Sequence, residues 1–218
     1  MIKAVLFDFD DTLVKTKEIR YEALKEAGKT FFNLNITDKD IDKHWGKPFN
    51  QFISGVFNNL EDAETLTQKY KSIVHKYPNK PFPKTKSVLN KLSRKYLLGI
   101  ISASNPELIL SGLENVGINK ETFFFIQSSE DTNIHKPNPQ VFIPSLIKLK
   151  SKGIGKTEVI YVGDAIDDYS SAVNAGFYFC CIANRTVDES VFTKQNIPYI
   201  TDFEKLPKYI EELVNGKS

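Results

Sequence analysis

Short apolar runs alternate with amphipathic stretches along most of the chain. Five runs lack polar alternation and are too short for helices, which is typical of strands buried on both faces: residues 4–9, 97–102, 123–127, 159–163 and 178–183. Between most of them, apolar residues recur at helical spacing, as at Val88, Leu89 and Leu92. Alternation of this kind predicts an α/β fold with a doubly wound parallel sheet covered by helices.

Residues 15–80 interrupt this alternation, because they contain no convincing strand. Residues 37–40 (TDKD) offer a capping box for one helix. Two sets of apolar residues recur at helical spacing: Ile19, Ala23, Leu24 and Ala27, then Leu66, Tyr70, Ile73 and Tyr77. We therefore expect residues 1–14 and 81–218 to form an α/β core, into which residues 15–80 are inserted as an all-helical domain.

Polar residues that could carry chemistry cluster at the predicted strand ends. They comprise two acidic groups, hydroxyls and one lysine in a proline-stiffened loop: Asp8, Asp10, Thr12, Ser102, Lys136, Asp164 and Asp168. Taken singly, such aspartates and serines also serve as turn formers and helix caps, and loop lysines are usually solvated. Because the carboxyl ends of parallel strands form one ligand crevice, these residues together indicate a site with a cation, a nucleophile and donors for an anion.

Four segments, DFDDT, IISAS, HKPNPQVF and GDAIDD, occur in this order along the chain. Their order and spacing resemble the four motifs of the haloacid dehalogenase superfamily, closest to its phosphoglycolate-phosphatase-like and β-phosphoglucomutase-like branch. The resemblance runs from about residue 2 to residue 183. It implies a Rossmann-like core with a helical cap between the first two motifs, and Mg²⁺-dependent hydrolysis of a small phosphate monoester through an aspartyl-phosphate.

The resemblance also implies a role for each matching residue. Asp8 would be the nucleophile and Asp10 the general acid/base. Mg²⁺ would be held by Asp8, Asp164 and the backbone carbonyl of Asp10, with support from Asp168 or from its neighbour Asp167, a choice that the sequence leaves open. The residues that would bind the phosphoryl group are Thr12, Ser102, Ala103 and Lys136.

The segment HWGKPFN, residues 44–50, resembles the substrate-specificity loop of the same family. His44, Trp45 and Lys47 are therefore candidate substrate contacts. The alternative is that Trp45 packs in the helical domain, that His44 is solvated and that Gly46 serves as a turn.

Two other functions stay open beside a phosphatase. A phosphomutase would use the same aspartyl-phosphate and return the phosphoryl group to a sugar, and a non-catalytic phosphate-binding or interaction protein could keep the fold. A dehalogenase is disfavoured, because halide needs no protonation and the dehalogenases of this superfamily lack an aspartate at the position of Asp10.

Composition limits the classes of partner that we expect the protein to bind. A formal net charge of +2 argues against nucleic-acid binding, and no window approaches the apolar length of a membrane helix. We expect a cytoplasmic monomer or weak homodimer that binds a small phosphorylated metabolite, with no nucleic acid and no membrane. Cys180 and Cys181 are expected to be buried small apolar residues, and the glycosylation pattern at 184–186 (NRT) is attributed to chance.

Overall fold

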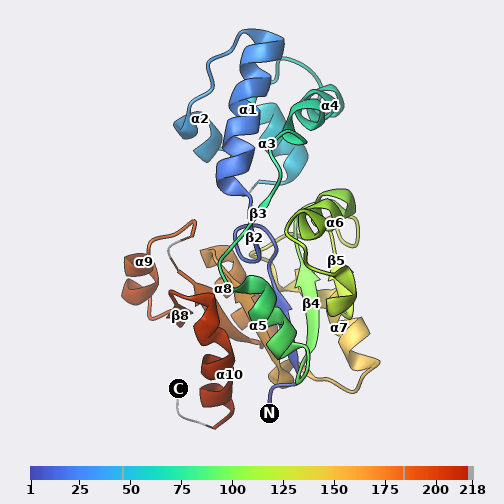
Figure 1. Cartoon of the computed structure of the whole chain (residues 1–218), viewed down its shortest axis with the longest axis vertical. Coiled ribbons are helices and arrows are strands. Elements are labelled where there is room, and N and C mark those ends of the chain that lie inside the picture. Colours follow the sequence, from blue (N-terminus) through green and yellow to red (C-terminus); the bar gives the residue numbers. More distant parts are fainter. Residues whose placement is uncertain (46, 184, 216–218) are drawn as a thin grey trace. The chain divides into compact units, whose positions relative to one another are not determined.

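The computed structural model describes residues 1–45, 47–183 and 185–215, and in it the chain forms two compact units (Figure 1). One unit combines Met1–Val14 with Pro81–Ser218, and the other is Lys15–Lys80. We refer to them as the α/β unit and the helical unit. Gly46 and Asn184, which belong to sequence patterns considered above, lie outside the described residues.

A six-stranded parallel sheet, in the order β5-β4-β1-β6-β7-β8, forms the centre of the α/β unit. Its strands are β1 (Ala4–Phe7), β4 (Leu97–Ile101), β5 (Phe125–Gln127), β6 (Val159–Gly163), β7 (Tyr178–Ile182) and β8 (Tyr199–Ile200). All four residues of β1 are buried, because neighbouring strands and helices cover this central strand on every side.

The predicted strands are mostly correct, and the differences have simple causes. β5 begins at Phe125, so the prediction of a strand from residue 123 is wrong at its start, where the side chain of Phe124 is 44% exposed. β1 ends at Phe7, two residues before the predicted end, and a turn follows at residues 11–13. β8 was not predicted, since two residues are too few to give a recognisable apolar run.

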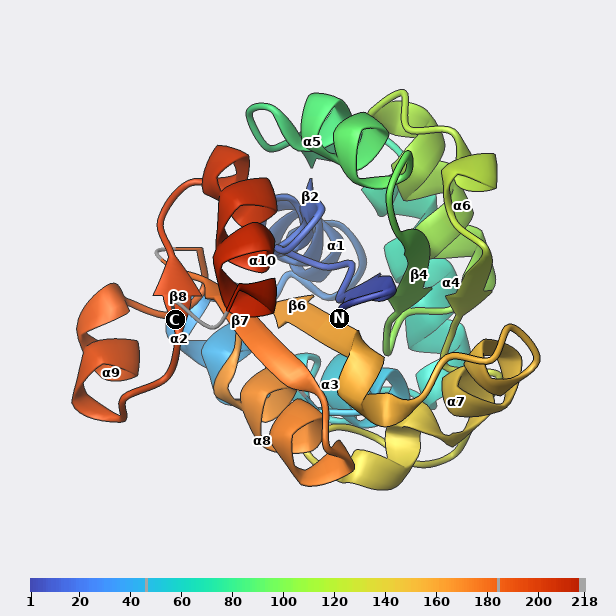
Figure 2. The same cartoon turned by 90° about the horizontal axis from the view of Figure 1, so that it is seen from below.

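Helices cover both faces of the sheet, which confirms the predicted doubly wound architecture. Figure 2 shows α5 and α10 on one side and α7 and α8 on the other, and the buried residues form two matching clusters. The helices of this unit are α5 (Thr85–Leu92), α6 (Pro106–Asn115), α7 (Ile143–Lys150), α8 (Ile166–Ala175), α9 (Glu189–Lys194) and α10 (Leu206–Val214). α6 begins where Asn105 accepts a hydrogen bond from the Leu108 N–H at 2.9 Å.

In the part of the helical unit that the structure describes, the helices are α1 (Lys17–Phe32), α2 (Asp38–Asp42), α3 (Phe49–Val56) and α4 (Ala63–Val74). Thr37 and Asp40 form the expected capping box at the start of α2. Most of the apolar residues that were predicted to share helix faces pack into one core, and Tyr77, which follows the end of α4, is partly buried against it. Ile19 is buried but does not belong to this core. Two short strands, β2 (Val14–Lys15) and β3 (Lys80–Pro81), pair with each other where the chain passes between the units.

Both cysteines are buried in β7, as predicted. Burial raises the pKa of each thiol, so neither is a thiolate near neutral pH. Within the described residues, none of the helices has the length and apolarity required to cross a bilayer.

Candidate active site

The turn after β1 carries the first acidic residues. The Asp8 N–H donates to the Val162 carbonyl at 2.8 Å, so Asp8 continues the line of the strand and its side chain is buried. Asp11 then adopts a φ of 55°, and its N–H donates to the Val14 carbonyl at 2.8 Å. A left-handed aspartate costs about 1–2 kcal/mol relative to an ordinary helical turn, so contacts around this turn must hold it.

Asp8 and Asp10 bind different partners, although they lie only two residues apart. Asp8 pairs with Lys136, whereas the Asp10 carboxylate accepts hydrogen bonds from Ser104 Oγ at 2.6 Å and Ser102 Oγ at 3.4 Å. Asp10 is also more exposed than Asp8. Lys136 therefore holds the Asp8 carboxylate, whereas the serines after β4 hold that of Asp10. With different partners, the two carboxylates can take different chemical roles.

Lys136 joins two of the strand-end motifs. Its Nζ lies 2.6 Å from Asp8 Oδ1, 2.6 Å from Asp168 Oδ1 and 3.0 Å from the Tyr161 hydroxyl. Burial alone would lower the pKa of this lysine, but Asp168 and Asp8 raise it well above its usual value. Lys136 is thus a fixed ammonium group and not a solvated loop lysine.

Three buried aspartates, Asp8, Asp164 and Asp168, place carboxylate oxygens within 4.8 Å of one another. Burial, with a further contribution from neighbouring carboxylates, raises the pKa of Asp8 well above its ordinary value and that of Asp164 to about 7. Hard oxygen donors that repel one another in this way fit a divalent cation such as Mg²⁺. Asp167 is exposed, so of the two candidates left open by the sequence, Asp168 is the one that joins this cluster.

Asp168 is both a helix cap and a member of the acidic cluster. Its Oδ2 accepts hydrogen bonds from the N–H groups of Asp164 and Ala165, each at 3.1 Å, at the start of α8. A Cβ at position 163 would come within 2.5 Å of the Asp168 Cβ, so the end of β6 requires glycine. The capping interpretation and the functional one therefore apply to the same side chain.

Two hydroxyls orient Asp164. Thr12 Oγ1 donates to Asp164 Oδ1 at 3.1 Å, and Thr186 Oγ1 donates to Asp164 Oδ2. Thr12 is fully buried, so its hydroxyl links the turn after β1 to the end of β6.

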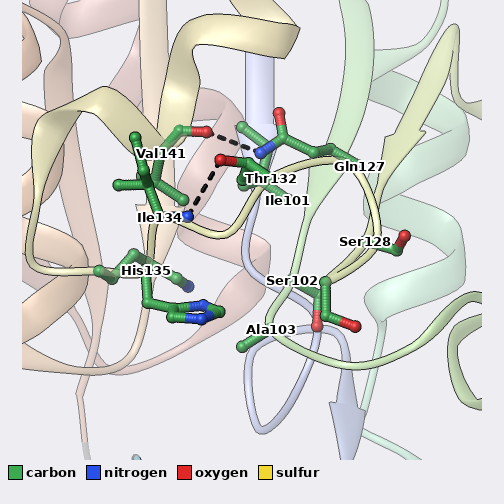
Figure 3. A pocket seen from close by; sticks show the side chains of 11 residues that line it. Ile101, Ser102, Ala103, Gln127, Ser128, Thr132, Ile134, His135 and Val141 are labelled. Atoms are coloured by element: carbon green, nitrogen blue, oxygen red, sulfur yellow. Dashed lines mark hydrogen bonds between the residues drawn. The ribbon is translucent and has the colours of Figure 1, made fainter. Parts of the chain in front are cut away.

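Ser102 and Ala103 line a small recess at the end of β4 (Figure 3). Ser102 Oγ also accepts from the Ser104 N–H at 3.0 Å. The recess has a volume of about 10 Å³, enough for roughly one water molecule. Lys136 belongs to its lining, together with Gln127 at the end of β5 and residues of the loop after it: Ser128, Thr132, Ile134 and His135.

Sequence reasoning missed several side chains that complete this arrangement: Ser104, Tyr161, Arg185 and Thr186. Tyr161 was detectable in principle, because a buried tyrosine in an otherwise aliphatic strand needs a partner for its hydroxyl. Ser104 lies in the quoted motif IISAS, two positions after Ser102. The segment of Arg185 and Thr186 gives no local signal, since Arg185 contacts Thr12, 173 residues away along the chain, and Thr186 contacts Asp164, 22 residues away.

The three residues that were predicted to contact substrate lie against or beside other residues of the helical unit. Trp45 packs edge-on against Tyr21 and Phe52, with ring centroids 5.4 Å and 5.6 Å away. His44 lies against Gly55, where a Cβ would come within 2.2 Å of the ring, and His44 Nδ1 is 3.2 Å from Lys47 Nζ on the exposed surface.

Comparisons with known proteins agree with this geometry. Residues 5–182 match the model of the haloacid dehalogenase-like hydrolase family. The chain is 30% identical over 182 residues to a Clostridium perfringens protein named "Putative pyrophosphatase PpaX", covering 83% of each chain. It is 27% identical to the glyceraldehyde 3-phosphate phosphatase of Methanopyrus kandleri, covering 81% of this chain and 82% of the other.

A solved structure agrees as well. The crystal structure titled "Putative haloacid dehalogenase-like hydrolase" from Bacteroides fragilis is 28% identical and superposes with a TM-score of 0.74, covering 92% of this chain and 95% of that one. The chain therefore belongs to the haloacid dehalogenase-like hydrolase family. The predicted enzyme class, a phosphatase of this family, is confirmed.

Proposed function

We propose that the protein is a Mg²⁺-dependent phosphatase that hydrolyses a small phosphate monoester through a phosphorylated Asp8. The observation that carries this proposal is the position of the Asp8 carboxylate, which is buried 2.6 Å from Lys136 and beside Asp164 and Asp168. A structural ion pair would not require two further buried carboxylates. A nucleophile that must approach a doubly negative ester does require cations around it.

Asp8 attacks phosphorus in the first half-reaction. A bond forms between a carboxylate oxygen and phosphorus, and the bond from phosphorus to the leaving oxygen breaks with its electron pair. Asp10, which Ser104 holds at 2.6 Å, gives a proton to that oxygen. Lys136 offsets the negative charge of the phosphoryl oxygens, and the donors around Ser102 and Ala103 stabilise them.

Mg²⁺ would be held by the carboxylates of Asp8 and Asp164 and by the backbone carbonyl of Asp10. When bound, it supplies Lewis-acid neutralisation of the phosphoryl charge. The chain prepares this site by orienting Asp164 through Thr12 and Thr186. Asp168 acts beside the ion, because its two oxygens are already engaged by Lys136 and by two backbone N–H groups.

Water completes the reaction. Asp10 is a carboxylate after its proton has left, so it accepts a proton from a water molecule that attacks the phosphorus of the aspartyl-phosphate. The bond to Asp8 breaks, and inorganic phosphate leaves. The side chain of Asp10 is more accessible than that of Asp8, as this second role requires.

The helical unit acts as the substrate-selecting cap in this proposal. His44 and Lys47 present an imidazole and an ammonium group on one exposed surface, and this pair suits an anionic or hydroxyl-rich substrate. Replacing Lys47 with methionine is expected to raise KM for the preferred ester while changing kcat little. An unchanged KM would remove Lys47 from the substrate contacts.

The function is tested by measuring phosphate release from a panel of esters with and without Mg²⁺. The panel includes pyrophosphate, glyceraldehyde 3-phosphate, phosphoglycolate and sugar phosphates. Steady release that depends on Mg²⁺ supports a phosphatase, whereas isomer formation without release supports a mutase. Metal binding has its own readout, because Mg²⁺ should raise the melting temperature of the wild-type protein and not that of Asp164→Asn.

A further inference from the structure

Arg185 lies in the loop after β7, outside all four motifs, yet it contacts the turn that carries Asp10. Its Nη1 donates to the backbone carbonyl of Asp11 at 3.2 Å and also to that of Thr12. These carbonyls follow directly after Asp10, and Asp11 has the left-handed conformation that the turn must maintain. One guanidinium group therefore fixes two consecutive peptide units of the catalytic turn.

Two aromatic rings hold the guanidinium in place. Its Cζ lies 3.3 Å from the centroid of the Phe82 ring and 5.7 Å from that of the buried Phe203. Stacking on one face leaves the edge of the planar group free to donate to carbonyls. A lysine ammonium cannot combine face-to-face stacking with this in-plane donation, so the geometry is specific for arginine.

The neighbouring residue reinforces the same connection. Thr186 donates to the Asp164 carboxylate from one side, and Thr12 donates to it from the other. The loop after β7 therefore touches both the turn after β1 and the end of β6. Although burial lowers the pKa of Arg185, it does so only to about 10, so the side chain remains charged at neutral pH.

We propose that Arg185 is a positioning residue for the reaction, which holds the Asp11–Thr12 turn so that the Asp10 backbone carbonyl and the Thr12 hydroxyl keep their places at the metal site. The proposal rests on the proposed phosphatase function. Arg185 donates its hydrogen bonds to backbone carbonyls, so the carboxylates stay available to the cation. Its effect should therefore appear in kcat and in the Mg²⁺ requirement more than in KM.

The test compares Arg185→Met and Arg185→Lys with Arg94→Met, a matched change at an exposed arginine. Both Arg185 variants should lower kcat and weaken Mg²⁺ activation by about 10- to 100-fold, the usual cost of losing a residue that orients metal ligands. KM should stay within about threefold, because substrate binding is not the main loss. Arg94→Met should behave as wild type.

Hydrogen–deuterium exchange reads the turn directly, whether or not any ester is hydrolysed. The amides of Asp11, Leu13 and Val14, whose hydrogen bonds close the turn, should exchange faster in Arg185→Met while β4, β6 and β7 keep their protection. Faster exchange throughout the sheet would mean general destabilisation and would overturn the proposal. Full rescue by Arg185→Lys, or wild-type kcat in Arg185→Met, would also overturn it, whereas an inactive wild-type chain would count against the proposed function itself.

Discussion

Ion pairs of the same length occur in the two units and have different surroundings. In the helical unit, Lys69 lies 2.6 Å from Glu61, and both side chains remain about one-third exposed. In the α/β unit, Lys136 lies 2.6 Å from Asp8 and from Asp168, and all three side chains are largely buried. Water screens the first pair and is excluded from the second, so equal distances do not mean equal energies.

The same contrast holds for buried polar groups in general. Among the described residues of the helical unit, the buried residues with a hydroxyl are Thr16, Tyr21 and Tyr70, and none of the buried residues is charged. The α/β unit buries Asp8, Asp11, Asp164 and Asp168 together with several hydroxyls. Burying like charges side by side opposes folding. The core of the helical unit therefore contributes to stability alone. In the α/β unit, the buried carboxylates at one edge of the sheet lower the stability of the fold and provide the groups for chemistry.

Replacing Asp8 with asparagine gives the largest expected effect. Turnover should fall by at least about 10³-fold, since the amide cannot form the phosphorylated intermediate. The melting temperature should hold or rise, because the change removes a charge that burial disfavours and that Asp168 and Asp164 repel. The exposed Asp167→Asn is the matched control and should keep its activity; equal losses in phosphate release from both variants would contradict the assignment of Asp8.

The two ion pairs can be compared directly with Lys136→Gln and Lys69→Gln. Loss of the buried ammonium leaves Asp8 and Asp168 uncompensated, so the free energy of unfolding should fall by about 3–5 kcal/mol. The exposed pair should contribute about 0–1 kcal/mol. Urea unfolding followed by circular dichroism measures both, and similar losses would show that burial does not separate the two pairs.

Removing a tyrosine hydroxyl from each unit compares a buried and a partly exposed hydrogen bond, with smaller expected effects on stability. Tyr161→Phe removes a buried hydroxyl that contacts Lys136, Asp168 and the Ile101 carbonyl, and should cost about 1–2 kcal/mol. Tyr77→Phe removes a partly exposed hydroxyl bonded to Glu26 and should change stability by less than about 0.5 kcal/mol. Thermal unfolding measures the stability of both variants. A larger loss of stability in Tyr77→Phe than in Tyr161→Phe would refute this argument.

The smallest effect on turnover is expected in the helical unit at Thr37, the first residue of the capping box. Thr37→Ala should lower the free energy of unfolding by about 1 kcal/mol, because α2 loses a cap. Its kcat should equal that of the wild-type protein. A reduced kcat measured alongside an unchanged melting temperature would tie this helix to the chemistry and weaken the contrast between the units.

The sequence predicted the sheet and the acidic strand ends because these features are local. Uninterrupted apolar runs mark strands buried on both faces, and the motifs place Asp8 and Asp164 after the neighbouring strands β1 and β6, and Lys136 in the loop after β5. The parts that were missed depend on distant contacts. Nothing near Arg185 in the sequence indicates that its guanidinium reaches the carbonyls of Asp11 and Thr12, and the choice of Asp168 over Asp167 requires the orientation of α8.

The central position of β1 also sets an order of events during synthesis. This fully buried strand is made before its partner residues, which begin at Leu97 in β4 and at Val159 in β6. At roughly 5–20 residues per second, the ribosome delivers them many seconds later. The whole of the helical unit, which is compact in itself, is made in that interval. The inserted helices can therefore fold before β4 and β6 are available to pair with β1. During that time β1 would be exposed to a chaperone.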